Sequence, residues 1–461
     1  MAAQESGAAA PAPSEVAQLR KEAAELRALL EKLEKRIDQI ESAASGSQTG
    51  APAANAVPPA AAPAAVAAKA PEAPAAATVA PPTGVAGLLA GTTLNVLLDT
   101  YYEYNFNAPI GRVNLLRAYD VSSNLFSLNQ AVLMLENAPN PDAGKRWGVR
   151  VDLQWGQATE SLQGNVVNEP RPDVYRNIFQ AYGTYVAPIG RGLTVDFGKW
   201  ASSLGLEGNY TQDQLNYSRS FLFNFLPFYH MGVRANYAFS DQFSMHYWVI
   251  NGTNQTEAYN GFKDESVGFT WQPAKPLSWT FNYYRGQEHP DEVYYPNGAP
   301  AGIINPPTQQ GVAFEPIGSP ATGKLNIIDS YLTWQVSKAL SFGLEGDWVI
   351  QRLYTNSAPA RVDGGAIYGH YQFTPKFGLA ARAEYVQDHG GMFSGITQDL
   401  KEATLTADYK LADNLLLRWE WRRDLSNRPY FYTPTLNSLK VGQTTAGLGV
   451  VWWFGGKQSP W

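Results

Sequence analysis

Cysteine is absent from the 461 residues, which excludes a disulfide framework, a thiolate metal site and a cysteine nucleophile. Charge is also scarce, because charged residues make up 16% of the chain against about a quarter in typical soluble domains. The formal net charge of −6 argues against a nucleic-acid partner, which would require a basic face. No apolar run reaches about 18 residues, so we expect no membrane-spanning helix.

Aromatic residues, in contrast, are abundant at 13% of the chain. An aromatic-rich, charge-poor sequence without a membrane helix leaves two main classes open. One is a large soluble β protein. The other is a transmembrane β-barrel, whose lipid-facing wall needs apolar residues only at alternate positions. The first residues contain no signal-peptide pattern, so an exported protein would be present here in mature form.

Residues 1–14 are expected to be disordered, and a heptad pattern follows over residues 15–41. Apolar residues recur there at alternating spacings of three and four, the pattern of a coiled-coil core. These core positions are Val16, Leu19, Ala23, Leu26, Leu30, Leu33, Ile37 and Ile40. An isolated helix of this length is marginal in water, so the apolar stripe needs a partner.

The charges beside the stripe favour a parallel partner of the same sequence. Glu15 would face Arg20, Glu22 would face Arg27, and Arg36 would face Glu41, all in attractive pairs. The stretch from Arg36 to Glu41 also resembles a short trimerisation motif of parallel coiled coils. The alternative is an amphipathic helix that packs on its own domain. Residues 42–90 are rich in Ala and Pro, and they predict an extended spacer without a core.

From Leu94 onward, apolar and polar residues alternate with a period of two, which indicates strands with one apolar and one polar face. About sixteen such segments are long enough for a tilted strand to cross a bilayer. They lie near 94–104, 127–136, 146–156, 176–187, 192–200, 229–238, 241–251, 264–273, 277–286, 325–335, 340–351, 361–373, 376–387, 399–410, 414–424 and 442–454.

The connections between these segments alternate between short and long, as in a barrel with short periplasmic turns and longer external loops. The sequence therefore predicts an all-β fold, a transmembrane antiparallel barrel of about sixteen strands within residues 91–461. An even strand count places both barrel ends on the short-turn side. The coiled coil and the spacer would then be periplasmic.

Residues 216–220, with the sequence NYSRS, are followed by Phe223, Pro227, His230 and Gly232, and then by Asn251 and Gly252. This pattern resembles the OmpL-like β-barrel porin-2 family of bacterial outer membranes, over residues 94–454. The resemblance implies an outer-membrane channel for small solutes.

The third long loop, 201–228, contains an aromatic cluster together with charged residues. In general porins the third external loop folds into the barrel, and by resemblance we expect this loop to form the constriction. Glu207 and Asp213 would face positive charges on the wall, an arrangement that orders dipolar solutes. The predicted pore-lining set is Glu207, Asp213, Arg219, Arg234, Arg382, Glu384, Arg418, Glu420 and Arg422. The alternative is a loop that caps the barrel or packs on a neighbouring subunit.

Charges on the polar faces should pair across strands, and Arg382 could pair with Glu420, or Arg418 with Glu384. We find no catalytic motif of a known enzyme class, and the five histidines lack the spacing of metal ligands. The predicted function is a trimeric outer-membrane porin for passive diffusion of small hydrophilic solutes or ions, surrounded by lipid and without a cofactor. A structural tether whose coil contacts peptidoglycan or partner proteins is the alternative, and a secreted soluble β enzyme is a third class.

Overall fold

The computed structural model describes residue 35 and residues 91–163, 169, 171–289 and 321–455. The predicted coiled coil, apart from Lys35, and the Ala/Pro-rich spacer lie outside the described residues. Within the described ranges, no helix combines the length and the apolar character needed to cross a membrane.

Sixteen long strands form the wall. They are β1 (Thr93–Asn105), β2 (Leu125–Asn137), β3 (Trp147–Trp155), β4 (Ile178–Ala187), β5 (Leu193–Ala201), β6 (Tyr229–Ala238), β7 (Phe243–Ile250), β8 (Asp264–Ala274), β9 (Leu277–Gly286), β10 (Leu325–Gln335), β11 (Leu340–Gln351), β12 (Ala360–Thr374), β13 (Phe377–His389), β14 (Gln398–Ala412), β15 (Leu415–Ser426) and β18 (Gly442–Gly455). Each of the sixteen predicted segments corresponds to one of these strands.

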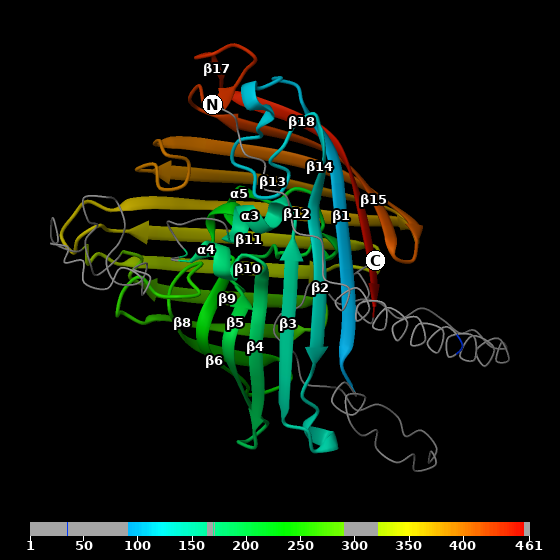
Figure 1. Cartoon of the computed structure of the whole chain (residues 1–461), viewed down its shortest axis with the longest axis vertical. Coiled ribbons are helices and arrows are strands. Elements are labelled where there is room, and N and C mark those ends of the chain that lie inside the picture. Colours follow the sequence, from blue (N-terminus) through cyan, green and yellow to red (C-terminus); the bar gives the residue numbers. More distant parts are fainter. Residues whose placement is uncertain (1–34, 36–90, 164–168, 170, 290–320, 456–461) are drawn as a thin grey trace, which may run out of the picture. The chain divides into compact units, whose positions relative to one another are not determined.

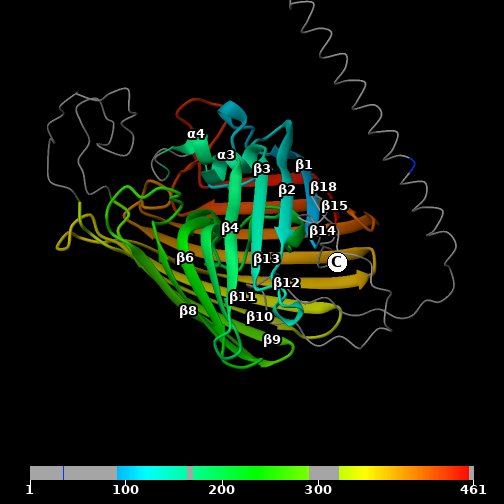
Figure 2. The same ribbon diagram turned by 60° about the horizontal axis from the view of Figure 1, so that its bottom comes forward.

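The strands form a closed antiparallel barrel in which sequence neighbours pair and β18 returns to β1 (Figures 1 and 2). The closing pair runs from Asn95 opposite Gly455 to Asn105 opposite Thr445. Closure leaves no strand edge with unpaired backbone groups, which is what a spanning sheet requires in lipid. The predicted all-β barrel of about sixteen antiparallel strands is confirmed.

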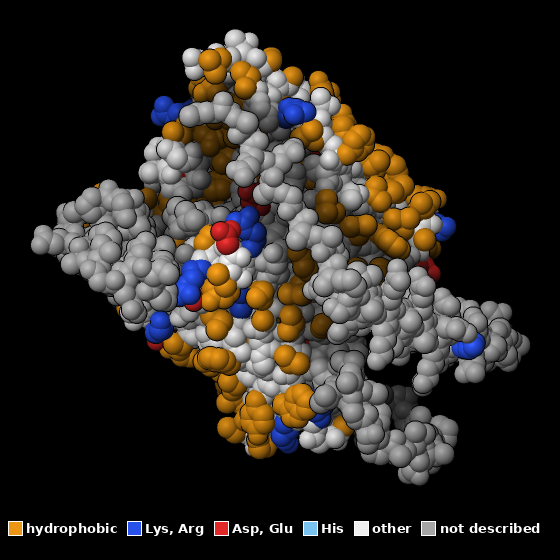
Figure 3. Space-filling view, viewed as in Figure 1, with side chains coloured by type: hydrophobic (Ala, Val, Ile, Leu, Met, Phe, Trp, Pro, Cys, Tyr) orange, Lys and Arg blue, Asp and Glu red, His pale blue; other side chains and the backbone are white. Residues whose placement is uncertain are grey.

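The outward face of the wall is apolar. Large hydrophobic side chains are exposed there at alternate positions, as Leu405, Trp419 and Trp421 are on β14 and β15. Figure 3 shows hydrophobic side chains gathered along the outer surface of the strands on the right of the view. Trp453 of β18, in contrast, points inward and is buried. In water this face would be unfavourable, whereas lipid matches it.

Short elements occur in several connections of the described chain, and none of them was predicted. They are the 3₁₀ turns η1 (Ile110–Arg112), η2 (Pro141–Ala143) and η3 (Thr211–Asp213), the helices α3 (Gln157–Gln163), α4 (Pro172–Tyr175) and α5 (Phe221–Phe225), and the hairpin β16–β17 (Phe431–Tyr432 and Leu439–Lys440). Ser220 caps α5, because its side chain accepts a hydrogen bond from the Phe223 N–H. These elements are too short for hydrophobic periodicity to reveal.

Candidate functional site: a loop held inside the barrel

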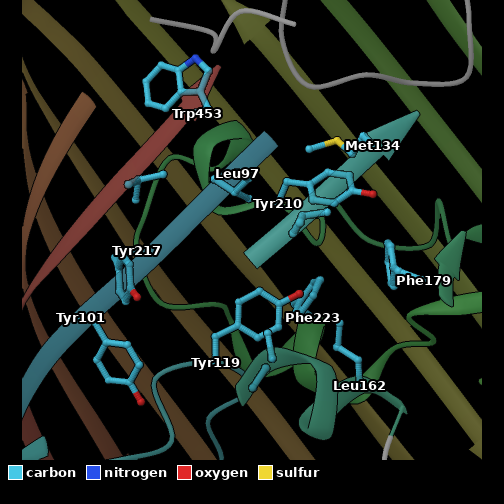
Figure 4. Close-up of a cluster of buried hydrophobic side chains, with 14 of the residues drawn as sticks. Leu97, Tyr101, Tyr119, Met134, Leu162, Phe179, Tyr210, Tyr217, Phe223 and Trp453 are labelled. Atoms are coloured by element: carbon cyan, nitrogen blue, oxygen red, sulfur yellow. The ribbon is translucent and has the colours of Figure 1, made fainter. Parts of the chain in front are cut away.

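The loop between β5 and β6, residues 202–228, folds into the barrel interior. Its aromatic side chains Tyr210, Tyr217 and Phe223 join a buried apolar cluster with inward side chains such as Leu97 of β1 and Trp453 of β18 (Figure 4). The opposite side of the loop contacts β12 and β13 through α5. The loop therefore bridges facing parts of the wall, and its apolar side chains supply the packing that holds it there.

Carboxylates on the wall accept hydrogen bonds from the loop backbone. Glu384 of β13 accepts the N–H groups of Phe221 and Leu222, both at 2.7 Å. Glu420 of β15 likewise accepts the N–H groups of Tyr217, at 2.6 Å, and Ser218, at 3.0 Å. Irregular backbone in a buried place needs such partners, because an unpaired N–H is unfavourable there.

Arginines on the wall donate to the loop carbonyl groups. Arg418 donates to the carbonyls of Thr211, at 2.9 Å, and Asn216, at 3.3 Å. Arg382 donates to the Ser218 carbonyl at 2.9 Å, and Arg422 donates to the carbonyl of Arg219. All three guanidinium side chains are inaccessible to solvent. We call these three arginines together with Glu384 and Glu420 the loop anchor.

Each anchoring arginine is also paired with a carboxylate of the wall. Arg418 lies 2.9 Å from Asp408, Arg382 lies 3.0 Å from Glu402, and Arg422 lies 2.7 Å from Asp424. These pairs compensate charges that would otherwise be buried alone.

The predicted pairs of Arg382 with Glu420 and of Arg418 with Glu384 are wrong. Strand β14 lies between β13 and β15, so the partners of each predicted pair are two strands apart, about 10 Å. The actual partner of Arg418 is Asp408, which lies directly opposite on the adjacent strand.

The charged residues of the loop itself occupy different environments. Glu207 lies 2.6 Å from Arg382 and accepts the Ser220 N–H, so acid and base are in direct contact. Asp213 ends η3 and is half-buried. Arg219 is buried and donates to loop carbonyls, including that of Gly208 at 2.9 Å. Burial lowers the pKa of the Arg219 guanidinium from its ordinary value.

Sequence reasoning missed the contacts on the side of β1 to β4. Asp99 of β1 accepts the hydroxyl groups of Thr211, at 2.8 Å, and Tyr217, at 2.9 Å. Asp152 of β3 accepts the hydroxyl of Tyr210. Both aspartates lie on the inward face of their strands, but nothing in the sequence identifies their loop partners.

A second loop also attaches to the wall, and this contact was missed as well. Arg117, in the connection between β1 and β2, lies 2.9 Å from Asp424 and pairs with Asp120. Burial alone would lower the pKa of Arg117, but Asp120, Asp424 and Glu103 together outweigh it and raise the pKa.

Small polar side chains line the barrel on the short-turn side of the loop. They point inward by alternation and are half-exposed: Thr184, Asn236, Ser244, Thr270, Thr333 and Ser341. Arg234, the ninth residue of the predicted pore-lining set, stands among them, partly exposed and paired with Asp196 at 2.7 Å. This part of the interior is hydrophilic and accessible to water.

A closed sixteen-stranded barrel with an apolar exterior, a polar interior and an inward-folded third loop defines the class of β-barrel porins. The family described as "Putative beta-barrel porin-2, OmpL-like" matches residues 91–454, and the chain belongs to this family. The resemblance found in the sequence is thereby confirmed.

Solved structures with a similar fold have low sequence identity. The outer membrane channel DcaP of Acinetobacter baumannii is 10% identical, with a TM-score of 0.48 over 79% of this chain and 97% of that chain. The anion-selective porin from Comamonas acidovorans is 8% identical, with a TM-score of 0.47 over 79% and 99%. OprB of Pseudomonas putida is 15% identical, with a TM-score of 0.46 over 80% and 96%. No curated protein matches the chain.

Proposed function

We propose that this protein is an outer-membrane channel for passive diffusion of small hydrophilic solutes or ions, narrowed by loop 201–228. The observation that carries the proposal is the inward surface below the loop, where hydroxyl and amide side chains stand half-exposed in a closed barrel. Such a surface would be unfavourable in a dry core, and it suits water and hydrated solutes.

The loop sets the narrowest level of this channel. Its position inside the barrel is supported by its contacts with Glu384 and Arg418 of the loop anchor and with Asp152 of β3, which lies on a different part of the wall. Each of the arginines Arg382, Arg418 and Arg422 is paired with a wall carboxylate, and Asp152 is paired with Arg150. We propose that this densely charged, paired level of the barrel favours dipolar solutes over apolar ones.

The test is conductance of the purified full-length protein in a planar lipid bilayer, with reversal potentials in a salt gradient and sugars, phosphates and amino acids as blockers. We expect discrete conductance steps. A matched variant is Thr333→Glu, which adds a charge to the hydrophilic surface and should shift the reversal potential toward cations. An absence of conductance would reject the channel.

The second candidate function is a structural tether, in which the barrel only anchors a periplasmic stalk. The complete burial of the anchoring arginines favours it, because a lumen filled by the loop would also bury them. The conductance measurement separates the two functions, since a filled barrel conducts nothing.

We further propose that the protein is a homotrimer and that the heptad segment 15–41 holds the three chains together on the periplasmic side. Its unbroken core positions and attractive flanking pairs support a parallel assembly. Deletion of residues 1–45, followed by measurement of mass and thermal stability in detergent, tests the role of the coil. An equally stable trimer would show that the coil does not hold it, and would leave peptidoglycan contact as its function.

A further inference from the structure

Three carboxylates lie together on the inward face of two adjacent strands. Asp329 of β10 is directly opposite Asp347 of β11, and Glu345 is two residues from Asp347 on the same face. Each contributes a carboxylate oxygen, and these oxygens all lie within 4.8 Å of one another. The three residues are 0%, 5% and 7% exposed for Asp329, Asp347 and Glu345.

The hydrogen bonds of the cluster leave three oxygens without donors. Both carboxylate oxygens of Asp347 and Oδ1 of Asp329 are buried and have no hydrogen-bond partner among the described residues. The other oxygens are occupied, because Asn282 donates to Asp329, while Tyr368 and the Leu206 N–H donate to Glu345 at 2.7 and 2.9 Å. Asp347 is therefore a buried acceptor aimed into the cluster, and Asp329, which lies within hydrogen-bonding reach, can satisfy it only by sharing a proton.

Among the described residues, no ion pair joins a positive side chain to this cluster. Arg361 on the adjacent strand β12 pairs with Asp363, and Arg382 on β13 pairs with Glu207 and Glu402. Three uncompensated carboxylates at this burial are strongly unfavourable, so either protons or a bound cation must neutralise them. Glu345 accepts two donors, which suits an ionised carboxylate.

We propose that Asp329, Glu345 and Asp347 bind a divalent cation of the calcium class. Calcium takes oxygen ligands at about 2.3–2.6 Å, so opposite ligands are separated by up to about 5 Å, which the observed spread of oxygens fits. Magnesium, with ligands at about 2.0–2.1 Å, requires a tighter set. Three carboxylates with free oxygens, completed by water, match the ligand chemistry of calcium.

The site also touches the start of the internal loop. Leu206 donates to Glu345, and the Ser203 carbonyl accepts from Asn282 at 3.3 Å and Tyr331 at 3.5 Å. A bound cation would fix the carboxylates that hold this stretch of the loop. Calcium would thereby stabilise the loop at its first residues.

The test is calcium binding to the full-length, folded protein by isothermal titration with CaCl₂ alone, after exhaustive dialysis against EDTA. We expect one calcium ion per chain in this cluster, and at least a tenfold loss of affinity in Asp347→Asn and Asp329→Asn. Asp196→Asn is the matched control, because Asp196 is a buried inward carboxylate already paired with Arg234 at 2.7 Å. This control should keep the affinity of the wild type.

A second measurement keeps the proposal falsifiable if the variants do not fold. Crystals of the wild type grown with terbium should give an anomalous difference peak between β10 and β11, beside Asp347. An empty map at this position, absence of calcium binding in the wild type, or equal affinity in Asp347→Asn would each overturn the proposal. An empty map or an absence of calcium binding would mean that protons, and not a cation, neutralise the three carboxylates.

Discussion

Replacement of Arg418 by methionine should release the internal loop. The side chain is fully buried, and its loss leaves Asp408 as an unpaired buried charge and removes the donor of several loop carbonyls. Breaking a buried ion pair by removing one partner reduces stability by about 3–5 kcal/mol. We expect the free energy of unfolding to fall by about this amount.

The same energy acts on the equilibrium between docked and released loop. A loss of about 3–5 kcal/mol shifts this equilibrium by roughly a hundredfold to several thousandfold, because about 1.4 kcal/mol corresponds to a factor of ten. Conductance should therefore rise, with frequent transitions between levels as the loop leaves the lumen. Single-channel recording measures the conductance, and urea unfolding in lipid vesicles, followed by tryptophan fluorescence, measures the stability.

Two variants serve as controls. Arg234→Met also removes one positive charge from the interior, but Arg234 is partly exposed and pairs only with the wall, so the loop should remain docked. The double variant Arg418→Met/Asp408→Leu removes both charges and should recover much of the lost stability, because no charge remains unpaired. The assigned role of the loop anchor would be refuted if the free energy of unfolding of Arg418→Met stayed within about 1 kcal/mol of the wild type and its conductance were unchanged.

Three further changes probe the wall and the loop. Glu384→Gln removes the charge that accepts two loop N–H groups and should reduce stability by about 1.5–3 kcal/mol in the same urea assay. Leu405→Arg places a charge on the apolar outward face and should reduce stability by about 2–4 kcal/mol. Thr333→Arg, on the hydrophilic inward face, should be tolerated, and equal losses would contradict the assignment of the two faces. Gly449→Ala introduces a Cβ about 2.4 Å from a tyrosine ring of the loop and should raise conductance, while Gly346→Ala has its nearest neighbour at 3.9 Å and should leave conductance unchanged.

The wall was predictable because a spanning strand repeats one simple rule along its length. Residues 325–335 and 340–351 were assigned from alternation alone, and β10 and β11 have these same bounds. Alternation also placed Arg382, Glu384, Arg418 and Glu420 on the inward face.

Alternation could not give the partners of these inward residues. The face on which a side chain lies is a property of one strand. The level of that side chain along the barrel axis and its neighbours depend on strand register and on the loop within the barrel. Glu384 accepts hydrogen bonds from two peptide N–H groups, and Arg418 donates to peptide carbonyls. Neither contact produces a recognisable pattern in the loop sequence. Asp347 lies on the inward face by the same alternation, but only the packed structure shows that its oxygens are buried without a donor from another strand or from the loop.

The loop anchor recognises peptide groups more than side chains. Glu384, Glu420 and Arg418 bind N–H and carbonyl groups that every amino acid except proline provides alike. The wall can therefore hold a loop whose half-exposed side chains differ, provided that the backbone keeps its path. Substitution of half-exposed loop residues such as Asp213 and Asn224 could therefore change solute selectivity without loss of the backbone contacts that attach the loop.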